Sequence, residues 1–521
     1  MNINPLIFNL TNKTNISLTN QSIAPRFFSS VVINCLRGGL AFITTLVIAR
    51  DLGPEEYGTY AFLVAISASI TVFLDLGTSN AFQTFICQKE RGKTFLFSYA
   101  CWQLFQFLLM LLVVGIVFPE ALLNKIFLGE NKDLVLLALA AVFMQQQAWT
   151  TMVKVGESKR LTQKVQLLTL SIAVVHFLLI IGLWVGEALS VHLLLWLVFI
   201  EHLIFLPVAW KALLVAETED GVFDGRSVLQ EYITYCFPLV FYSFLGGGFN
   251  FIDRWLLQNY GGSTQQGIYE VGLRIGVVSL LVTMSILNIF WKEISEAKEN
   301  GNLEQMRILY FKCSRFLFTV GALSAGFLIP WSEEIIGLLL GPSYIESSPV
   351  LVAILIYSAF RSLGILNVSM MLATSKTKAN VIFGSILGTV SIPCTYFVLA
   401  PKNVYISGLE LGSLGLSIKM LVFSIIYSSC VSWWICQDYG WKFSWIYQLA
   451  ALGGSLSCGW FSFELVDAIN SLISINLFFK GVLAIFLFCG SAGAMLWYMP
   501  SVAGISQQEI KIFCSKFTKL S

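Results

Sequence analysis

The sequence predicts an all-α polytopic membrane protein with about 14 transmembrane helices, arranged as two parallel six-helix repeats plus two C-terminal helices. Three observations indicate this class: the composition, a series of long apolar runs and an internal repeat. Of the 521 residues, 56% are hydrophobic and 12% are charged, and the mean hydropathy is +0.77. A soluble domain carries about 25% charged residues. The net charge of +2 also gives no basic field that would favour a nucleic-acid partner.

Apolar runs of about 20 residues, the length that crosses a bilayer as a helix, follow one another along the chain. Turn residues separate them, as at Gly53-Pro54 and Gly341-Pro342. The predicted spans are approximately 27–48, 58–82, 95–117, 134–153, 165–185, 190–210, 232–252, 267–290, 312–331, 348–372, 379–399, 407–435, 443–462 and 472–498.

The internal repeat has a constant offset of 209 positions. Gly38-Gly39 returns as Gly247-Gly248, and Gly53-(x4)-Gly58-x-Tyr60 returns as Gly262-(x4)-Gly267-x-Tyr269. An even number of spans in this interval makes the two halves parallel, with a cleft between them, which is an architecture of transporters. Glycines in the first helix of each half permit close helix approach or bending.

Charge in the loops predicts the orientation. Twenty-two Lys and Arg residues fall in the termini and alternate loops, and five fall on the opposite side. Because basic loops stay in the cytoplasm, both termini are predicted to be cytoplasmic. The predicted segments are a disordered cytoplasmic tail (1–25), a first six-helix bundle (26–215), a cytoplasmic linker (216–231), a second six-helix bundle (232–436), a C-terminal helix pair (437–500) and a cytoplasmic tail (501–521).

Four cations inside predicted spans are the candidate substrate-binding residues: Arg37, Arg274, Arg361 and Lys419. A charge at membrane depth costs a few kcal/mol, so such residues face a partner or a wet cavity. Arginine and lysine in a lumen suit an anionic ligand such as phosphate or carboxylate. Local pairing remains an alternative for two of them, Arg37 with Asp75 and Arg274 with the residue one turn earlier, Glu270.

Two acids inside the spans, Asp75 and Glu201, are candidates for coupling transport to protons or sodium. Asp253 and Arg254, at the outer end of a predicted span, are interpreted either as a pair of charges at the membrane boundary or as a gate at the outer mouth. Gln145-Gln146-Gln147 is interpreted either as a sugar-binding group or as a helix-helix contact.

The remaining polar residues give no sign of a cofactor, a metal site or an enzyme. The three histidines lie in apolar helices without a partner at metal-ligand spacing, and the 11 cysteines show no CxxC pair, so buried free thiols are expected. The sequence has no P-loop, no Gly-x-Ser-x-Gly elbow and no sizeable outer loop, as a membrane glycosyltransferase or polymerase would need.

Two segments resemble a known family. Residues 48–60 (IARDLGPEEYGTY), followed by Asp75-Leu76-Gly77, resemble the start of bacterial polysaccharide flippases of the Wzx type. These flippases belong to the multidrug/oligosaccharidyl-lipid/polysaccharide exporter (MOP) superfamily. The stretch from Asp253-Arg254 to Gly267-Ile268-Tyr269 is similar to the matching segment of the second half, and the resemblance covers about residues 25–435.

The resemblance implies a transporter in the bacterial inner membrane that flips an undecaprenyl-pyrophosphate-linked oligosaccharide by alternating access. It implies a part in O-antigen, lipopolysaccharide or exopolysaccharide synthesis, with a polysaccharide polymerase and glycosyltransferases as partners. Because one chain holds both halves, a monomeric working unit among membrane lipids is expected. The alternative is a cation-coupled exporter of drugs or metabolites from the same superfamily, with a carboxylate-centred pocket.

Overall fold

The computed structural model describes residues 23–88, 91–214, 224–474 and 476–504. Apart from the connecting loops, this part of the chain is helical, and it contains no strand. The first half comprises α1 (Ile23–Asp75), α2 (Thr78–Gln88), α3 (Lys93–Leu112), the π-helix η1 (Val113–Val117), α4 (Glu120–Phe127), α5 (Lys132–Val142), the π-helix η2 (Phe143–Ala148), α6 (Trp149–Ser158), α7 (Thr162–Val185) and α8 (Val191–Leu214). The second half comprises α9 (Gly225–Gly276), α10 (Leu280–Glu299), α11 (Leu303–Leu328), α12 (Ser332–Leu340), the 3-10 helix η3 (Pro342–Ser347), α13 (Ser348–Ala373), α14 (Thr377–Leu399), α15 (Gly412–Asp438), α16 (Ile446–Ile473), α17 (Leu477–Tyr498) and the 3-10 helix η4 (Pro500–Ala503).

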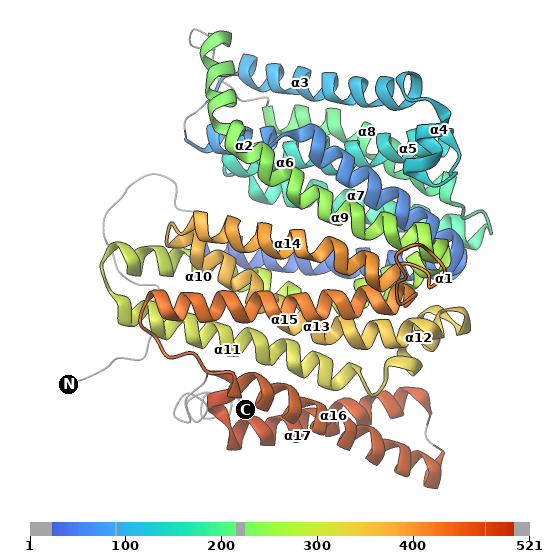
Figure 1. Cartoon of the computed structure of the whole chain (residues 1–521), viewed down its shortest axis with the longest axis vertical. Coiled ribbons are helices and arrows are strands. Elements are labelled where there is room, and N and C mark those ends of the chain that lie inside the picture. The colour runs from blue at the N-terminus through green and yellow to red at the C-terminus, as the bar shows by residue number, and fades with distance from the viewer. Residues whose placement is uncertain (1–22, 89–90, 215–223, 475, 505–521) are drawn as a thin grey trace.

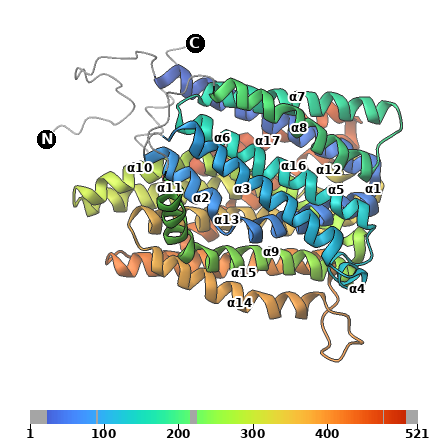
Figure 2. The ribbon, with the colours of Figure 1, turned by 90° about the horizontal axis from the view of Figure 1, so that it is seen from above.

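The long helices run roughly parallel to one another in both views (Figures 1 and 2). Figure 1 shows α3–α8 at one end of the molecule, α10–α15 in the middle and α16–α17 at the other end. The two longest helices, α1 and α9, pack against each other where the first two groups meet. The last pair joins the rest chiefly through α16, which packs on α11.

Eleven helices in the described residues are long and apolar enough to cross a membrane, or twelve if the bent pair formed by α9 and α10 counts as one span. The expected all-α membrane fold is therefore confirmed, whereas this count does not confirm the number fourteen. The difference lies in α1 and α9, each of which joins two predicted spans. A straight helix of 53 residues, the length of α1, would be about 80 Å long.

One glycine interrupts each of these two long helices. Gly53 has φ 70° and ψ 176°, and Gly262, its equivalent in the repeat, has φ 71° and ψ −178°. Both conformations are non-helical and have a positive φ, which glycine adopts without steric cost. In Figure 1 α1 runs to one edge of the molecule and turns back there. The 209-residue offset thus joins two positions with the same backbone geometry.

Only one of the four glycines that open the repeat marks a close helix contact. A Cβ on Gly38, Gly39 or Gly248 would meet no atom within 4 Å, whereas one on Gly247 would lie 3.0 Å from the Phe73 ring of α1. A closer approach between the halves occurs at the glycines that follow the two turns. This difference arises because a sequence motif cannot show which face of a helix its neighbour covers.

Two short helices between spans were not predicted, and each contacts the opposite half of the chain. Beside α4, the Trp255 indole of α9 donates to the Lys125 carbonyl at 3.2 Å. After α12, the Tyr344 hydroxyl donates to the Ala49 carbonyl of α1 at 2.9 Å. These reciprocal contacts tie each half to the turn region of the other.

Helix α9 begins at Gly225, so the last part of the predicted linker 216–231 is helical instead. Asp224 caps this helix by accepting a hydrogen bond from the Arg226 amide at 3.1 Å. The predicted N-terminal tail (apart from residues 23–25), the first half of the linker and most of the C-terminal tail lie outside the described residues.

Candidate functional site

A cavity of about 540 Å³ in the second half brings two of the four predicted cations together. Arg361 of α13 and Lys419 of α15 both line it, and Asp253 of α9 lies with them. Aromatic side chains, including Phe249 and Tyr357, form part of the wall. The cavity is therefore amphipathic, with basic groups beside apolar surface.

The ammonium group of Lys419 is already neutralised by a carboxylate. Its Nζ lies 2.9 Å from Oδ1 and 2.8 Å from Oδ2 of Asp253, and Thr395 donates to Oδ1 at 2.7 Å. The Lys419 side chain is 5% exposed. A buried charge needs such a partner, because removing one member of the pair leaves the other uncompensated.

Arg361, by contrast, forms no ion pair with any residue that the structure describes, and its side chain is exposed to the cavity. It lies one helical turn after Tyr357 on α13. A guanidinium group offers five donors in a planar fork that fits phosphate or carboxylate. Arg361 is thus the cavity residue that is available to hold an anion.

Arg274 belongs to a second cluster on α9. Glu270 accepts from Arg274 Nε at 2.7 Å and from an Arg254 terminal nitrogen at 2.6 Å. Arg254 also lies over the Tyr269 ring, 4.6 Å from its centroid. The predicted pairing of Arg274 with Glu270 is confirmed, but the cluster has two cations for one acid, and the Arg274 side chain remains 57% exposed.

Arg37 does not pair with Asp75. The Asp75 carboxylate accepts from the hydroxyls of Thr78 and Ser79 at 3.0 and 2.9 Å, and from the Gln147 amide at 2.7 Å. It therefore ties the break between α1 and α2 to the π-helix η2. Arg37 is exposed on α1 and forms no ion pair within the described residues. For Gln147, the predicted helix-helix contact is the one observed.

Glu201 has a partner that the sequence reading missed. Its Oε2 lies 2.9 Å from Nδ1 of His176 on the neighbouring helix α7, and the Glu201 side chain is 5% exposed. Its other oxygen, Oε1, has no hydrogen-bond partner in the described residues. Neither residue is part of a group of three metal-binding side chains within the described residues. All ten cysteines in the described residues are free.

The two halves meet at equivalent glycines just beyond the turns. A Cβ on Gly58 would lie 1.7 Å from the Ser263 carbonyl oxygen, and one on Gly267 would lie 2.1 Å from the Pro54 carbonyl oxygen. Because Pro54 and Ser263 are also separated by the repeat offset, the contact is pseudo-symmetric. The Thr59 hydroxyl adds a hydrogen bond to the Ser263 hydroxyl at 3.0 Å.

Comparison with known proteins is consistent with this architecture. The profile of the polysaccharide biosynthesis protein family matches residues 24–290, half of the chain. The chain belongs to this family. No curated protein sequence matches it.

Three solved structures have a similar fold. This member of the polysaccharide biosynthesis family is similar to the lipid II flippase MurJ in an inward closed conformation, with a TM-score of 0.67 and 14% identity over 90% of this chain and 99% of that chain. It is also similar to an inward-facing MATE multidrug transporter of the MOP superfamily, with a TM-score of 0.55 and 11% identity over 79% and 94%. A third match is the MATE multidrug transporter DinF-BH, with a TM-score of 0.53 and 14% identity over 83% and 100%. At these identities the likeness shows the fold alone.

The structure also identifies functional candidates that the sequence reading did not select. Asp253 and Arg254 were interpreted together, as a boundary pair or a gate at the outer mouth. In the structure Asp253 pairs with Lys419 of α15, and Arg254 pairs with Glu270 of α9. The repeat gave one signal that these two charges are special to the second half, because the equivalent positions of the first half hold the uncharged residues Thr44 and Thr45. The charges at this depth of the helix are therefore a property of the second half alone.

Proposed function

We propose that this protein flips an undecaprenyl-pyrophosphate-linked oligosaccharide across the bacterial inner membrane by alternating access. The observation that carries this proposal is the cavity in the second half, where Arg361 has no counter-ion among the described residues and Lys419 has one. A pyrophosphate carries the charge that this site lacks. Membership of the polysaccharide biosynthesis family supports the substrate class.

The substrate head group would first bind Arg361 and then compete for Lys419. A phosphate oxygen near the Lys419 ammonium offers the same charge-assisted hydrogen bond as Asp253 does. Exchange of partners would free the Asp253 carboxylate and weaken the link from α15 to α9. Because Asp253 and Thr395 belong to different helices, substrate binding would be coupled to a change in helix packing.

The contact between Gly58 and Gly267 would be the part that closes one end of the cleft. With both termini cytoplasmic, the turns at Gly53 and Gly262 face the periplasm, so the structure would correspond to a cytoplasm-facing state. The two halves would then separate at this contact when the transporter opens outward. A single chain contains both halves of the cleft, so we propose a monomer as the working unit.

The substrate would come from glycosyltransferases on the cytoplasmic side and pass to a polysaccharide polymerase on the other side. The polymer made from it would be O-antigen, lipopolysaccharide or exopolysaccharide. We propose no chemical step for the protein itself, because transfer between leaflets requires only binding and a change of conformation.

A cation-coupled exporter of drugs or metabolites is the second candidate, and the Glu201–His176 pair is the observation that favours it. A buried carboxylate with one free oxygen can take up a proton inside a membrane protein. The same pair would serve as a proton-coupling site in the flippase. The two functions therefore differ in substrate and share this group.

The experiment is complementation of a strain that lacks its own polysaccharide flippase. The native chain is compared with Arg361→Gln, which keeps hydrogen-bond donors but removes the charge, and with Arg307→Gln as the control. Arg307 is a half-exposed arginine on α11 that pairs with Glu304 and does not line the cavity. All proteins are expressed at equal level, and surface polymer is measured.

Polymer restored by the native chain and by Arg307→Gln, but lost with Arg361→Gln, is the expected result. Restoration by all three would retain the flippase and reject the role of Arg361. Absence of polymer together with drug efflux in the native chain would favour the exporter.

A further inference from the structure

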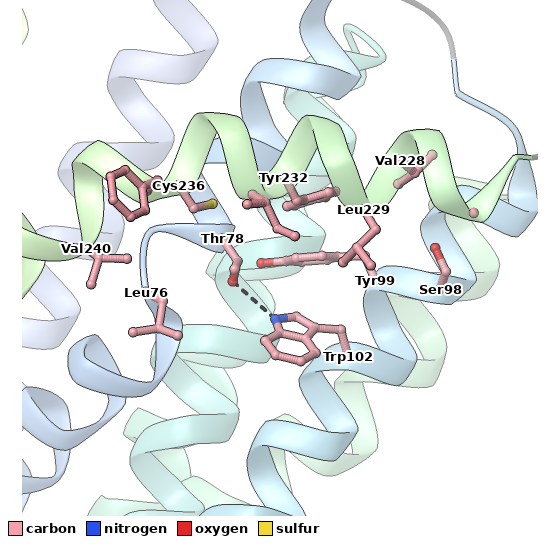
Figure 3. A pocket seen from close by; sticks show the side chains of 13 residues that line it. Leu76, Thr78, Ser98, Tyr99, Trp102, Val228, Leu229, Tyr232, Cys236 and Val240 are labelled. Carbon is pink, nitrogen blue, oxygen red and sulfur yellow. Dashed lines mark hydrogen bonds between the residues drawn. The ribbon is translucent and has the colours of Figure 1, made fainter.

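A second cavity, of about 610 Å³, lies away from the cationic site, between α3 and the first third of α9 (Figure 3). On one side stand Tyr99 and Trp102 of α3, and on the other a single face of α9. The Trp102 indole donates to the Thr78 hydroxyl at 3.3 Å, which orients the ring at the base of the cavity. Nearly all of the remaining lining is apolar.

The α9 wall is one continuous helical stripe. Its residues follow the spacing of a single helix face from Gly225 to Val240. At a rise of about 1.5 Å per residue this stripe is about 22 Å long. Val240 is the last residue of α9 that lines the cavity, and one turn further on the Phe244 ring stacks on Phe73 of α1 with centroids 5.2 Å apart. The cavity is thus a groove whose lining on α9 has this length.

The groove opens sideways, in the direction in which a bilayer would lie. Phe237 is 82% exposed, and Leu229 and Ile233 are each 60% exposed. Such apolar exposure on a helix of a membrane protein faces hydrocarbon, because water would make it costly. The occupant therefore enters from the membrane and is itself a hydrocarbon chain.

The length of the groove indicates which kind of lipid hydrocarbon chain it fits. Half of a bilayer, including its head-group layer, is about 20–22 Å thick. The lining on α9 begins at Gly225, the first residue of the helix, and ends at Val240, so its length matches one leaflet. An acyl chain of a phospholipid fits this length, whereas a much longer polyprenyl chain would extend beyond the lined groove.

The position of the groove gives the lipid a role in the contact between the two halves. On its opposite face, the first third of α9 is held to the first half by two polar contacts. Arg91 pairs with Glu231 at 2.6 Å, and the Thr84 and Tyr235 hydroxyls lie 2.9 Å apart. The groove is the part of this interface that protein atoms leave unfilled. A chain that fills it adds dispersion contacts to both helices.

We propose that this groove is a binding site for one acyl chain of a phospholipid, which stays bound between α3 and α9 and stabilises this packing of the two halves. The site is separate from the cationic cavity, and its occupancy does not depend on which substrate the protein carries.

The test uses the full chain in phospholipid nanodiscs with a phospholipid that bears a photoreactive group in its acyl chain. Labelled peptides are mapped by mass spectrometry in the native chain, in Ile233→Trp and in Leu108→Trp. The first variant fills the groove with an indole. The second places the same ring at a 55% exposed position of α3 that does not line the groove, and so controls for folding and for general lipid contact.

In the native chain and in Leu108→Trp we expect strong labelling of the 225–240 segment. In Ile233→Trp we expect about tenfold less, since displacing two methylene groups of the chain costs about that factor. Equal labelling in the two variants would overturn the site. Displacement of the label by an equimolar polyprenyl phosphate would overturn the phospholipid as occupant. Equal melting temperatures of the three proteins would show that the difference does not come from misfolding.

Discussion

The pseudo-symmetric glycine contact predicts that adding one methyl group opens one end of the cleft. In Gly58→Ala the new Cβ would lie 1.7 Å from the Ser263 carbonyl oxygen and 2.6 Å from its carbonyl carbon, well inside contact distance. Both atoms belong to the backbone, so no side-chain rotation relieves the overlap. The two helices must move apart by more than an ångström, which breaks the Thr59–Ser263 hydrogen bond as well.

Two terms set the size of the effect on the closed-to-open ratio. Overpacking costs about 1–3 kcal/mol, and the lost hydrogen bond adds about 1 kcal/mol. The gain of about 0.5–1 kcal/mol from alanine in place of glycine inside a helix applies to the closed and the open state alike, so it cancels from the ratio. The net shift against the closed contact is therefore about 2–4 kcal/mol, or roughly 30- to 900-fold in the closed-to-open ratio.

Disulfide formation between Thr59→Cys and Ser263→Cys measures this ratio, because the two hydroxyl oxygens are 3.0 Å apart in the closed contact. We expect slower cross-linking when Gly58→Ala is added. Gly248→Ala is the control, since its Cβ would meet no atom within 4 Å and only the helix-stabilising term remains. Equal cross-linking rates with Gly58→Ala and Gly248→Ala would refute the reasoning.

Three further predictions concern single side chains. Lys419→Met should destabilise the fold by about 3–5 kcal/mol, because it leaves the Asp253 carboxylate without its cation. Adding Asp253→Asn should restore most of this loss. A thermal unfolding series in which the effects of the two substitutions simply add would contradict the pairing. Tyr344→Phe should cost about 1 kcal/mol by removing the hydrogen bond to the Ala49 carbonyl, and a lower Tm than that of the native chain is the readout. Burial raises the pKa of Glu130 in the loop before α5, so the folded state binds this proton more strongly than the unfolded state does. Its stabilising effect is present at low pH and is lost as pH rises through the raised pKa, and Glu130→Gln should remove that part of the pH dependence of Tm.

Much of the fold could be read from the chain because the bilayer imposes a simple rule. Apolar length specifies a spanning helix, so the runs that become α7, α14 and α17 were predicted within a few residues. The short helices α4 and α12, which lie in loops, could not be predicted in this way. The segments around them contact the opposite half of the chain, and their local sequence does not indicate those contacts.

Only part of the candidate site could be predicted from the sequence. Arg361 and Lys419 were selected because charge is costly at membrane depth, and that argument needs no structure. Which cation is free is a different question. It depends on Asp253, which lies 166 positions from Lys419 in the chain and pairs with it only after folding. The same holds for Asp75, whose carboxylate goes to Gln147 and not to Arg37.

By itself the sequence determined the class of protein, the repeat and the set of charges within the predicted spans, since each follows from composition or from spacing along the chain. Only the tertiary structure decided which charges cancel, which glycines touch and where the cavities lie. The physical reason is distance: electrostatic pairing and van der Waals contact act over a few ångströms in space, and helices from opposite halves reach that range only when α1 and α9 pack together.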